Sequence, residues 1–548
     1  MKKEYFSYDE EKNRFWRACC ADSICIYRCK CRSCPRGGNT CFSTVNKHGV
    51  SISANAEEEQ ISKDHFKYIE ETETVVNEKT GEETAVPAIR ITGYDLEGAS
   101  GYSKFEAIKE GKKTIGYKMV LPSEINGIPV TAIGNSAFED YSQLIAVEIP
   151  ASVKMIGRWA FHNTGLTEID IPENVQTIQY QAFGFDRQED EEGNRLDAPL
   201  TKITLHNGLE KIENSAFYGS SITSIDIPYT LTEGSGAFSE CDKLAQVNFL
   251  TDENGNAMQK IPASLLEGCK SLTAIELPAK GLKEIGSWAF KNTGLTEIDI
   301  PGNVKTIGYQ AFKYDADAEN KSPLTKITLN EGLVSIGEGA FANAQITELH
   351  IPSTLWECGS SPFGQCYQLK KVTFADQLFK IPEHLLENCT ALEEVELSEK
   401  VDTIGQSAFA GCNSLTKVVI PDAYCRIDSW AFENTDCVVY STVDADAEEG
   451  AQTVQNYTAE NNVKFESLGD YTQPDPYYGD LNKDGSVDIV DVLIVNKAVL
   501  GVEHVTWQQT ERGDVDKGDN GERMDSTDSL NILKYIVKII EDFSALVK

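Results

Sequence analysis

The chain repeats itself internally. "WAFHNTGLTEIDIPENVQTIQYQAF" begins at Trp159 and "WAFKNTGLTEIDIPGNVKTIGYQAF" begins at Trp288, and the two are nearly identical over 25 residues. A shorter unit, L-x-x-I-x-I-P-x-x-V-x-x-I-G-x-x-A-F, underlies both. Its last position recurs mostly every 21 to 24 residues, as Phe138, Phe161, Phe183, Phe217, Phe238, Leu266, Phe290, Phe312, Phe341, Phe363, Leu386, Phe409 and Phe432. Recurrence at this period predicts a solenoid of 13 stacked units.

Each unit predicts one strand and one return segment. "LTEIDIP" alternates apolar and polar residues as a half-buried strand does, and Pro172 ends it because proline cannot donate to a ladder. The following "VQTIQYQAF" returns Val175, Ile178, Ala182 and Phe183 to the interior. Such a unit buries one side only and must stack on its neighbours.

The cysteines fall into two sets. Seven of the 15 lie between Arg17 and Cys41, in spacings that match no standard zinc finger, and a zinc site there is the less favoured alternative. The others run from Cys241 to Cys437, and five of them lie three residues after the last position of their unit, where other units have Thr, Ser or Ala. We predict a slot for small buried side chains, with disulfides or a reactive thiol as the alternative.

Composition and motifs exclude several classes of function. The chain has 86 Asp and Glu against 50 Lys and Arg, a formal net charge of -36 that repels nucleic acid and anionic lipid. No apolar run approaches the roughly 20 residues of a membrane span. The seven His are scattered, and no H-E-x-x-H, G-x-S-x-G or Walker motif is present. We therefore predict no catalytic residue and no enzyme activity.

The ends of the repeat array predict caps. "FKYIEETETVVNEKTGEETAVPAIRITGY" indicates a β-hairpin with a turn near Gly81, ahead of the first unit. After the last unit, the sequence predicts a strand, a helix over residues 448–461 and a final strand. "SISANA", ending at Ala56, is typical of a signal-peptidase site, although no continuous apolar stretch precedes it; we expect export and exclude residues 1–56 from the fold.

Near the C-terminus, "GDLNKDGSVDIVDVLIVNKAVLG" has the spacing of a calcium loop. Oxygen-bearing residues alternate from Asp480, and Gly485 falls at position six, where the loop turns sharply. Position twelve is Asp491, shorter than the usual Glu, so the following helix must begin close to the ion. The predicted ligands are Asp480, Asn482, Asp484, Ser486 through its carbonyl, Asp488 and Asp491.

A second loop follows in "GDVDKGDNGERMDSTDSLNILKYIVKII", from Gly513, and its last ten or so residues predict an amphipathic helix. This loop is three residues longer than the first, so that Asp519, Asn520 and Gly521 compete for positions five and six. The predicted ligands are Asp514, Asp516, Asp519, Asp525 and Asp528.

Two family resemblances follow from these motifs. The I-P, I-G and A-F signature resembles the BspA-like bacterial leucine-rich repeats, whose members are typically secreted or cell-surface interaction proteins. The tandem loops with following helices resemble a type I dockerin, which folds around two Ca²⁺ ions and binds cohesin domains of scaffoldins. The fold class implied is a mainly β leucine-rich repeat solenoid followed by a small all-α calcium-binding domain.

The resemblances also imply boundaries and partner-binding residues. The segments are a Cys-rich leader 1–56, an N-terminal cap 57–119, the solenoid 120–440, a C-terminal cap 441–468, a linker 469–478 and the dockerin 479–548. In dockerins, positions ten and eleven and exposed helix residues contact cohesin. Here these are Ile489, Val490, Asn496, Lys497, Ser526, Thr527, Lys534 and Lys538. The two halves differ, which predicts cohesin binding in one orientation through one dominant helix.

The expected function is that of a secreted or surface-associated, non-catalytic adaptor. Its solenoid binds a protein or a glycan, and its dockerin tethers it to a cohesin-bearing scaffoldin, in a cellulosome-type assembly for polysaccharide catabolism. Two alternatives stay open. One is a surface adhesin that contacts host proteins, and the other is a dockerin-bearing carbohydrate-active enzyme.

Overall fold

The computed structural model describes most of the chain from Ile52 to Ile536. The described residues are 52–53, 59–76, 81, 83–97, 99, 101, 105–186, 197–316, 320–447, 453–470, 478–502, 504–515 and 524–536. The Cys-rich leader with its alternative zinc site, and most of the signal-peptidase motif, lie outside them. So do most of the polar insertion after Asp186 and three of the proposed site residues, Asp516, Asp519 and Lys538.

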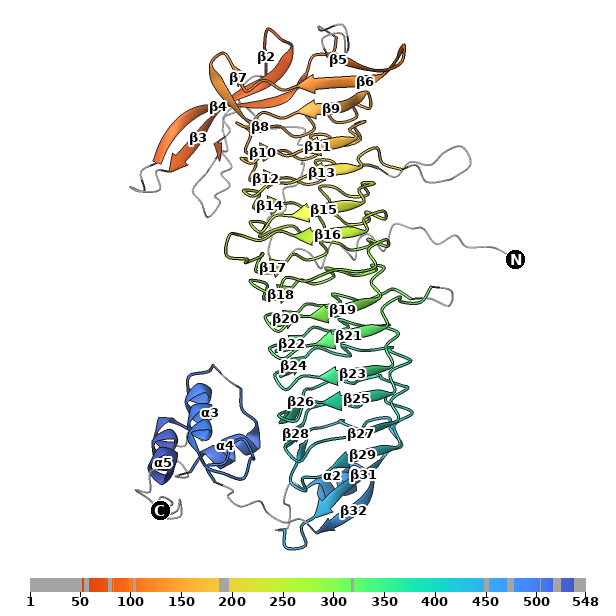
Figure 1. The fold of residues 1–548 in the computed structure, drawn as a ribbon, viewed down its shortest axis with the longest axis vertical. Coiled ribbons are helices and arrows are strands. Elements are labelled where there is room, and N and C mark those ends of the chain that lie inside the picture. The colour runs from red at the N-terminus through yellow and green to blue at the C-terminus, as the bar shows by residue number, and fades with distance from the viewer. Residues whose placement is uncertain are drawn as a thin grey trace, which may run out of the picture.

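The repeats form an elongated solenoid with two ladders of short parallel strands (Figure 1). The first ladder, on the left in Figure 1, contains β8 (Ile128–Ile133), β10 (Met155–Ile156), β12 (Thr177–Ile178), β14 (Lys211–Ile212), β17 (Lys260–Ile261), β18 (Glu284–Ile285), β20 (Thr306–Ile307), β22 (Ser335–Ile336), β24 (Glu357–Cys358), β26 (Lys380–Ile381), β28 (Thr403–Ile404) and β30 (Arg426–Ile427). Equivalent residues of successive units pair in register, as Ile156 does with Ile178.

The second ladder lies on the right in Figure 1 and is formed by the "LTEIDIP" segments. It contains β9 (Leu144–Glu148), β11 (Glu168–Asp170), β13 (Lys202–Thr204), β15 (Ser224–Ile227), β16 (Gln246–Phe249), β19 (Glu297–Ile300), β21 (Lys326–Leu329), β23 (Glu348–Ile351), β25 (Lys371–Phe374), β27 (Glu394–Glu396), β29 (Lys417–Ile420) and β31 (Val438–Val443). The prediction of one strand per unit is therefore wrong, since nearly every unit supplies two. The first-ladder strands are mostly two residues long, which is too short to show an alternating pattern.

A column of aromatic rings fills the interior between the ladders. Phe161 stacks on Phe183 with ring centroids 5.2 Å apart, and Phe312 on Phe341 at 5.1 Å, with the planes within 9° of parallel. The residues predicted to face inward, Val175, Ile178, Ala182 and Phe183, are all buried. A single core extends from Phe66 to Val454. Because each ring contacts only its neighbours above and below, the coils stabilise one another pairwise.

The glycine of the I-G motif is needed for close stacking of the coils. A Cβ atom on Gly308 would lie 2.6 Å from the backbone nitrogen of Ser287, and one on Gly337 would lie 2.6 Å from the carbonyl carbon of Gly308. Cβ atoms do not approach backbone atoms this closely, so a larger residue would push adjacent coils apart.

The array is capped at both ends. β3 (Phe66–Val76) and β4 (Glu83–Tyr94) form the predicted antiparallel hairpin, and β4 pairs with β8 to cover the first coil. A second hairpin, β5 (Glu106–Glu110) with β6 (Lys113–Val120), extends the second ladder through β9. The remaining N-terminal strands are β1 (Ile52–Ser53), β2 (Gln60–Ile61) and β7 (Glu124–Ile125).

At the other end, β31 pairs with β32 (Lys464–Asp470), and α2 (Val454–Glu460) packs against this edge. The helix begins later than predicted because Thr453 is its N-cap, with the Asn456 amide donating to the Thr453 hydroxyl. No helix in the described part of the chain is long and apolar enough to cross a membrane.

The cysteine slot is as predicted. Cys241, Cys269, Cys366, Cys389 and Cys412 are all fully buried. All eight cysteines in the described residues are free thiols. Burial raises the pKa of Cys241 to about 12, which keeps its sulfur protonated and unreactive at neutral pH. These side chains act as small apolar residues.

The C-terminal helical region, residues 478–536, lies beside the last coils (Figure 1). It contains α3 (Ile489–Val499), α4 (Trp507–Gly513) and α5 (Ser526–Ile536). The helices after the two loops are as predicted, whereas α4 is not predicted. A capping box between Thr506 and Gln509 begins α4 and was its sequence signal.

Candidate functional site

The first acidic loop is closed by its last carboxylate. Asp491 Oδ1 accepts from the Leu481 amide at 2.8 Å, and Asp491 Oδ2 accepts from the Asp488 amide at 2.8 Å. At the other end, Asp480 accepts from the amides of Asp484 and Gly485, the latter at φ 83°. Only a residue that adopts the left-handed backbone without strain suits this turn, which explains the glycine at position six.

The second loop has the same closure. Asp528 Oδ1 accepts from the Val515 amide at 2.9 Å, and Asp528 Oδ2 accepts from the Asp525 amide at 2.8 Å. Asp525 accepts from the Thr527 amide, as Asp488 accepts from the Val490 amide. The closing residues of the two halves therefore correspond, with Asp491 equivalent to Asp528 and Ile489 equivalent to Ser526.

The electrostatics of the first loop suit a hard cation. Asp480 and Asp491 are both fully buried. Burial raises the pKa of both carboxyl groups, and burial together with the smaller effect of the charge on Asp480 raises the pKa of Asp491 to about 6. Two desolvated carboxylates close to each other favour a positive ion between them. Ca²⁺ takes six to eight oxygen ligands of this kind.

The proposed ligands are not gathered into a closed cluster. In the described residues, no three acidic, His or Cys side chains converge as preformed metal ligands. Asp484 and Asp488 instead accept hydrogen bonds from the Ser486 and Val490 amides. Asn482 donates to Asp484 at 2.8 Å. Asp480 and Asp491 likewise accept amide hydrogen bonds with both of their carboxylate oxygens, so all four side chains are engaged within the loop.

An apolar surface is exposed on the two helices that follow the loops. On α3, Ile489, Val490 and Leu493 are 54%, 44% and 51% exposed. On α5, the equivalent of Leu493 is Leu530, which is 50% exposed, and Leu533 lies one turn further on. We call these five residues the outer helix face. Apolar side chains exposed together in this way are typical of a protein-binding surface.

The remaining predicted partner-binding residues in the described part of the chain lie on the same two helices. Ser526, Thr527 and Lys497 are exposed. Asn496 is half-buried and accepts a hydrogen bond from the Ser529 hydroxyl at 3.0 Å, and Lys534 donates to Asn531, so both are engaged within the helical region. Sequence reasoning missed Leu493, Leu530 and Leu533. The spacing of four residues from Ile489 to Leu493, and from Ser526 to Leu530, was the signal that would have found the first two.

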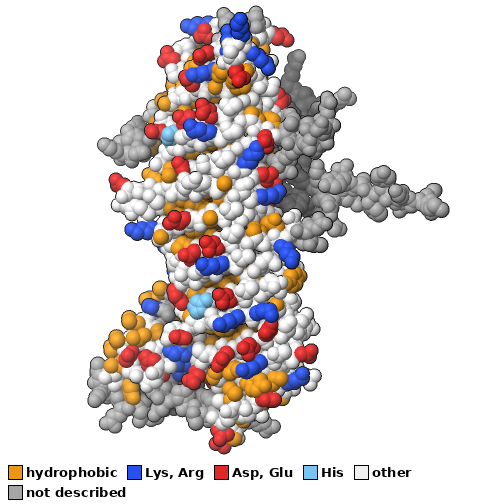
Figure 2. All heavy atoms as spheres, turned by 45° about the vertical axis from the view of Figure 1, so that its right-hand side comes forward, with side chains coloured by type: hydrophobic (Ala, Val, Ile, Leu, Met, Phe, Trp, Pro, Cys, Tyr) orange, Lys and Arg blue, Asp and Glu red, His pale blue; other side chains and the backbone are white. Residues whose placement is uncertain are grey.

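The second ladder presents a polar face to solvent. Its outward residues form cross-strand pairs such as Glu297 with Lys326, 3.5 Å apart, and Asp226 with Asn248, which donates at 2.7 Å. Figure 2 shows acidic and basic side chains interspersed along the molecule, without a large area of one sign. Such a face offers many hydrogen-bonding groups to a polar ligand.

Surface aromatic residues of the first ladder pack between coils. The Trp159 ring meets Tyr180 edge-on at 5.5 Å, and its Nε1 donates to Gln181 of the next coil at 2.8 Å. Trp288 and Tyr309 repeat this arrangement at 5.2 Å. The groove beside Trp159 has a volume of about 630 Å³, but its charged walls already form ion pairs with one another.

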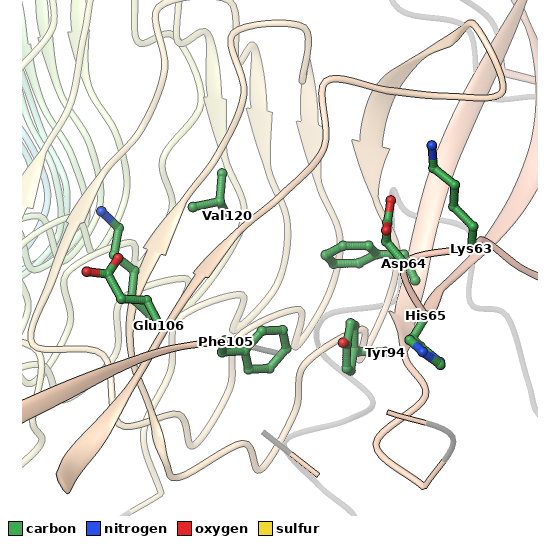
Figure 3. A pocket seen from close by; sticks show the side chains of 9 residues that line it. Lys63, Asp64, His65, Tyr94, Phe105, Glu106 and Val120 are labelled. Atoms are coloured by element: carbon green, nitrogen blue, oxygen red, sulfur yellow. The ribbon is translucent and has the colours of Figure 1, made fainter. Parts of the chain in front are cut away.

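A cavity of about 380 Å³ lies in the N-terminal cap (Figure 3). Its floor is an aromatic cluster in which the Tyr94 ring lies 5.1 Å from Phe66 and 4.6 Å from Phe105. Burial and the nearby charges of Asp64 and Asp95 raise the pKa of Tyr94. These rings belong to the core that covers the first coil, which assigns the cavity to cap packing.

Comparison with protein-family models identifies both regions. The model of the BspA type leucine rich repeat region matches residues 118–188, 196–319 and 318–438, together more than half of the chain. The chain belongs to the BspA-type leucine-rich repeat family. The model of the dockerin type I domain matches residues 478–537, so the C-terminal helical region is a dockerin. Neither a repeat region nor a dockerin is a catalytic domain.

Several solved structures align with much of the chain at low identity. A leucine-rich repeat protein from Bacteroides ovatus is 21% identical, with 73% of this chain and 99% of that chain covered and a TM-score of 0.40. A leucine rich cell surface protein from Faecalibacterium prausnitzii is 19% identical over 71% and 96% of the two chains, with a TM-score of 0.31. The pneumococcal vaccine antigen PcpA is 16% identical over 75% and 98%, with a TM-score of 0.35. No curated protein matches the chain.

Proposed function

We propose that the protein is an extracellular, non-catalytic adaptor. Its dockerin binds a cohesin domain of a scaffoldin, and its solenoid binds a protein or glycan that the adaptor brings to the assembly. The setting is a cellulosome-type complex for polysaccharide catabolism. The observation that carries the proposal is the outer helix face above two matched acidic loops.

The outer helix face suits a protein partner because it is apolar and lies on two helices that contact each other through Ser529 and Asn496. Ile489 and Val490 lie at positions ten and eleven of the first loop, directly after the Asp488 N-cap. Leu493 and Leu530 extend the same surface along α3 and α5. Exposed aliphatic residues in a group favour association with a complementary apolar patch.

Calcium would fold this surface into place. In the first loop, Asp480, Asn482, Asp484, Asp488, Asp491 and the Ser486 carbonyl would hold one ion. In the second, Asp514, Asp525 and Asp528 would hold another, with Asp516 and Asp519 as further ligands. When bound, Ca²⁺ neutralises the clustered carboxylates. Asp491 and Asp528 each link a loop to the first turn of α3 or α5, so ion binding fixes the helix that bears the partner surface.

The solenoid ligand is proposed to lie on the second ladder. That face is long, regular and rich in paired polar groups such as Asp226 with Asn248 and Glu297 with Lys326. Stacked repeats commonly use such extended faces for binding. A glycan or a polar protein surface has the hydrogen-bonding groups to match it.

The test is calorimetric titration of the full chain with a panel of cohesins, first with calcium and then with excess chelator. We expect binding that the chelator abolishes. Leu493→Glu places a charge in the outer helix face. It should weaken cohesin binding at least tenfold, because it removes a central apolar contact. Leu468→Glu is the matched control, because Leu468 is 48% exposed on β32, outside that face, and should leave binding unchanged.

Other outcomes would redirect the proposal. Absence of binding to every cohesin, together with binding of the solenoid to epithelial or matrix proteins, would favour the adhesin alternative. Release of reducing sugar from polysaccharide by the purified chain would favour a carbohydrate-active enzyme.

A further inference from the structure

The dockerin contacts the solenoid through one short segment and one loop residue. His504 stacks on Trp356 with ring centroids 5.1 Å apart and the planes 16° from parallel. The Thr506 hydroxyl donates to Asp402 Oδ2 at 2.5 Å, and Gln508 Nε2 donates to the Tyr424 carbonyl at 2.7 Å. These three dockerin residues alternate along the chain, and their partners lie on separate coils.

The fourth contact is an ion pair removed from solvent. Lys483 Nζ lies 2.9 Å from Asp422 Oδ2, and the two side chains are only 7% and 8% exposed. Lys483 occupies position four of the first acidic loop, between the proposed ligands Asn482 and Asp484. A buried pair of this kind is strongly destabilised when one partner is removed, because the other charge is left without compensation.

The solenoid residues at this contact differ from those of earlier coils. The position directly before each first-ladder strand is Gln259, Lys283 and Lys305 in the middle of the array, and all three are exposed. In the last coils, the same position is Trp356, Phe379 and Asp402, which are half-buried or buried. Lys380 also lies over the Trp356 ring, 4.9 Å from its centroid. The change from polar to largely apolar residues occurs where the dockerin lies.

The contact is connected to the first calcium loop at two points. Thr506 is the N-cap of α4, and Arg512 lies near the other end of that helix. The Arg512 guanidinium donates to the Asp480 carbonyl at 3.3 Å, and the Arg512 carbonyl accepts from the Gly479 amide. Lys483 lies inside the loop at φ 53°, a left-handed backbone that lysine seldom adopts. The loop conformation therefore determines where both Lys483 and α4 are held.

We propose that the last four coils of the solenoid are a docking surface for the chain's own dockerin, and that calcium binding in the first loop and docking favour each other. The proposal rests on the proposed calcium binding of that loop. Calcium fixes the loop from Asp480 to Asp491 and so orients Lys483 toward Asp422. By reciprocity, a docked dockerin binds this first ion more tightly than an undocked one.

The docked arrangement leaves the partner surface free. Figure 1 shows α4 on the side of the dockerin nearest the solenoid, with α3 and α5 beyond it. The hydrogen bonds, the ion pair and the ring stacking described above come from α4, the segment before it and Lys483. Docking therefore engages the first loop and holds the outer helix face, which is exposed, at a fixed angle to the solenoid.

The experiment uses Asp422→Asn in the full chain. This change keeps the side-chain oxygen that accepts from the Tyr424 amide at 2.9 Å, but it leaves Lys483 without its opposite charge. Glu396→Gln is the matched control, since Glu396 is an exposed carboxylate on β27 in the second ladder. Calcium titration by calorimetry and small-angle X-ray scattering with and without calcium are measured for all three chains.

We expect Asp422→Asn to weaken one calcium site about tenfold, within the usual range of coupling between sites, and to leave the other unchanged. Its scattering in saturating calcium should match the more extended form that the unaltered chain adopts after chelation. Trp356→Ala, which alters no charge, should extend the molecule in the same way. The control should behave as the unaltered chain.

The outcomes separate this inference from the proposed function. Equal calcium affinities and equal scattering in Asp422→Asn and the unaltered chain would overturn the linkage and leave calcium binding intact. Unchanged scattering in Trp356→Ala as well would overturn the docking surface itself. A chain that binds no calcium would overturn both the linkage and the calcium-dependent tether.

Discussion

The solenoid and the dockerin obtain their stability in opposite ways. The solenoid has one core from Phe66 to Val454, in which each coil packs against neighbouring coils of similar sequence. In the described part of the dockerin, the fully buried core is Leu481, Val492, Val495, Val515 and Ile532. A core this small seldom supports a fold without a metal or another domain. The comparison teaches that repetition makes the solenoid independent, whereas the small dockerin core is expected to need the proposed calcium ions and the neighbouring coils.

Calcium removal should have the largest effect, and it should act on the dockerin but not on the solenoid. With excess chelator, we expect the dockerin helices to unfold, because the buried carboxylates of Asp480 and Asp491 lose the ion that compensates them. The thermal unfolding transition of the solenoid should stay unchanged. Far-UV circular dichroism and differential scanning calorimetry of the full chain measure both regions. A single transition that shifts as a whole with calcium would contradict the separation.

Truncation within the ring column should affect the solenoid alone. Phe341→Ala removes a fully buried ring that stacks on both Phe312 and Phe363. We expect a loss of about 3 to 5 kcal/mol in the free energy of unfolding, from lost burial and the cavity left behind. Chemical denaturation followed by intrinsic fluorescence measures it.

The control for the ring column is Tyr367→Ala, since Tyr367 is 55% exposed and its loss should cost little. The calcium affinities of the dockerin should be the same in both variants. A change in calcium affinity for Phe341→Ala would mean that the damage reaches the adjacent coil, which carries Trp356 and ends at Phe363.

The contact between the solenoid and the dockerin should depend on pH. Burial raises the pKa of Asp402 from its ordinary value to about 6, and Lys483 and Asp422 are the charged groups near it. Because the docked form has the raised pKa, docking is strongest when the carboxyl group is protonated, weakens as the pH rises toward 6 and no longer changes well above 6, where both forms are ionised. Between pH 7.5 and pH 5 docking should strengthen by about 1.4 kcal/mol, since the docked pKa lies one unit above pH 5.

Scattering of the full chain in saturating calcium, between pH 5 and pH 7.5, measures this dependence. Asp402→Asn should remain docked across the range, because it keeps an acceptor for Thr506 and has no charge to desolvate. Continued pH dependence in that variant would assign the effect to another group.

The smallest expected effect compares the two dockerin halves with each other. Replacing Ser526 and Thr527 with Ile and Val gives α5 the residues of α3 and should raise cohesin affinity a few fold, corresponding to about 1 kcal/mol of added apolar contact. Calorimetry measures it, and the reverse exchange of Ile489 and Val490 is the control that should lower the affinity. Unchanged affinity in both would show that these positions do not contact cohesin.

Much of this architecture is readable from the sequence because it is local or periodic. The recurring Phe predicts the solenoid, and the acidic spacing from Asp480 predicts the loop and the helix that follows. The second strand of each unit was missed because a strand of two residues is too short to show an alternating pattern of apolar and polar residues. The outer leucines were missed because Leu493 and Leu530 follow an ordinary helical pattern and become distinctive only once their exposure is known.

The interface between the domains was beyond sequence reasoning for a different reason. Thr506 and Asp402 are 104 residues apart, and Lys483 and Asp422 are 61 apart. No motif links such pairs, and each residue alone is an ordinary surface type. The one sequence signal was the presence of Trp356 and Phe379 at a position that is polar in the middle coils. That signal could be assigned to an interface only after the structure showed the dockerin beside these coils.

The spacing of those contacts also has a mechanical consequence. A scaffold pulling on α3 and α5 would draw on the solenoid through Trp356, Asp402 and Asp422, which belong to different coils, as well as through the covalent chain after β32. The force then acts as a shear load on several coils at once. It does not act on the last coil alone, which would separate from the end of the solenoid. Load shared among several coils in this way would resist a pull better than load on the last coil alone.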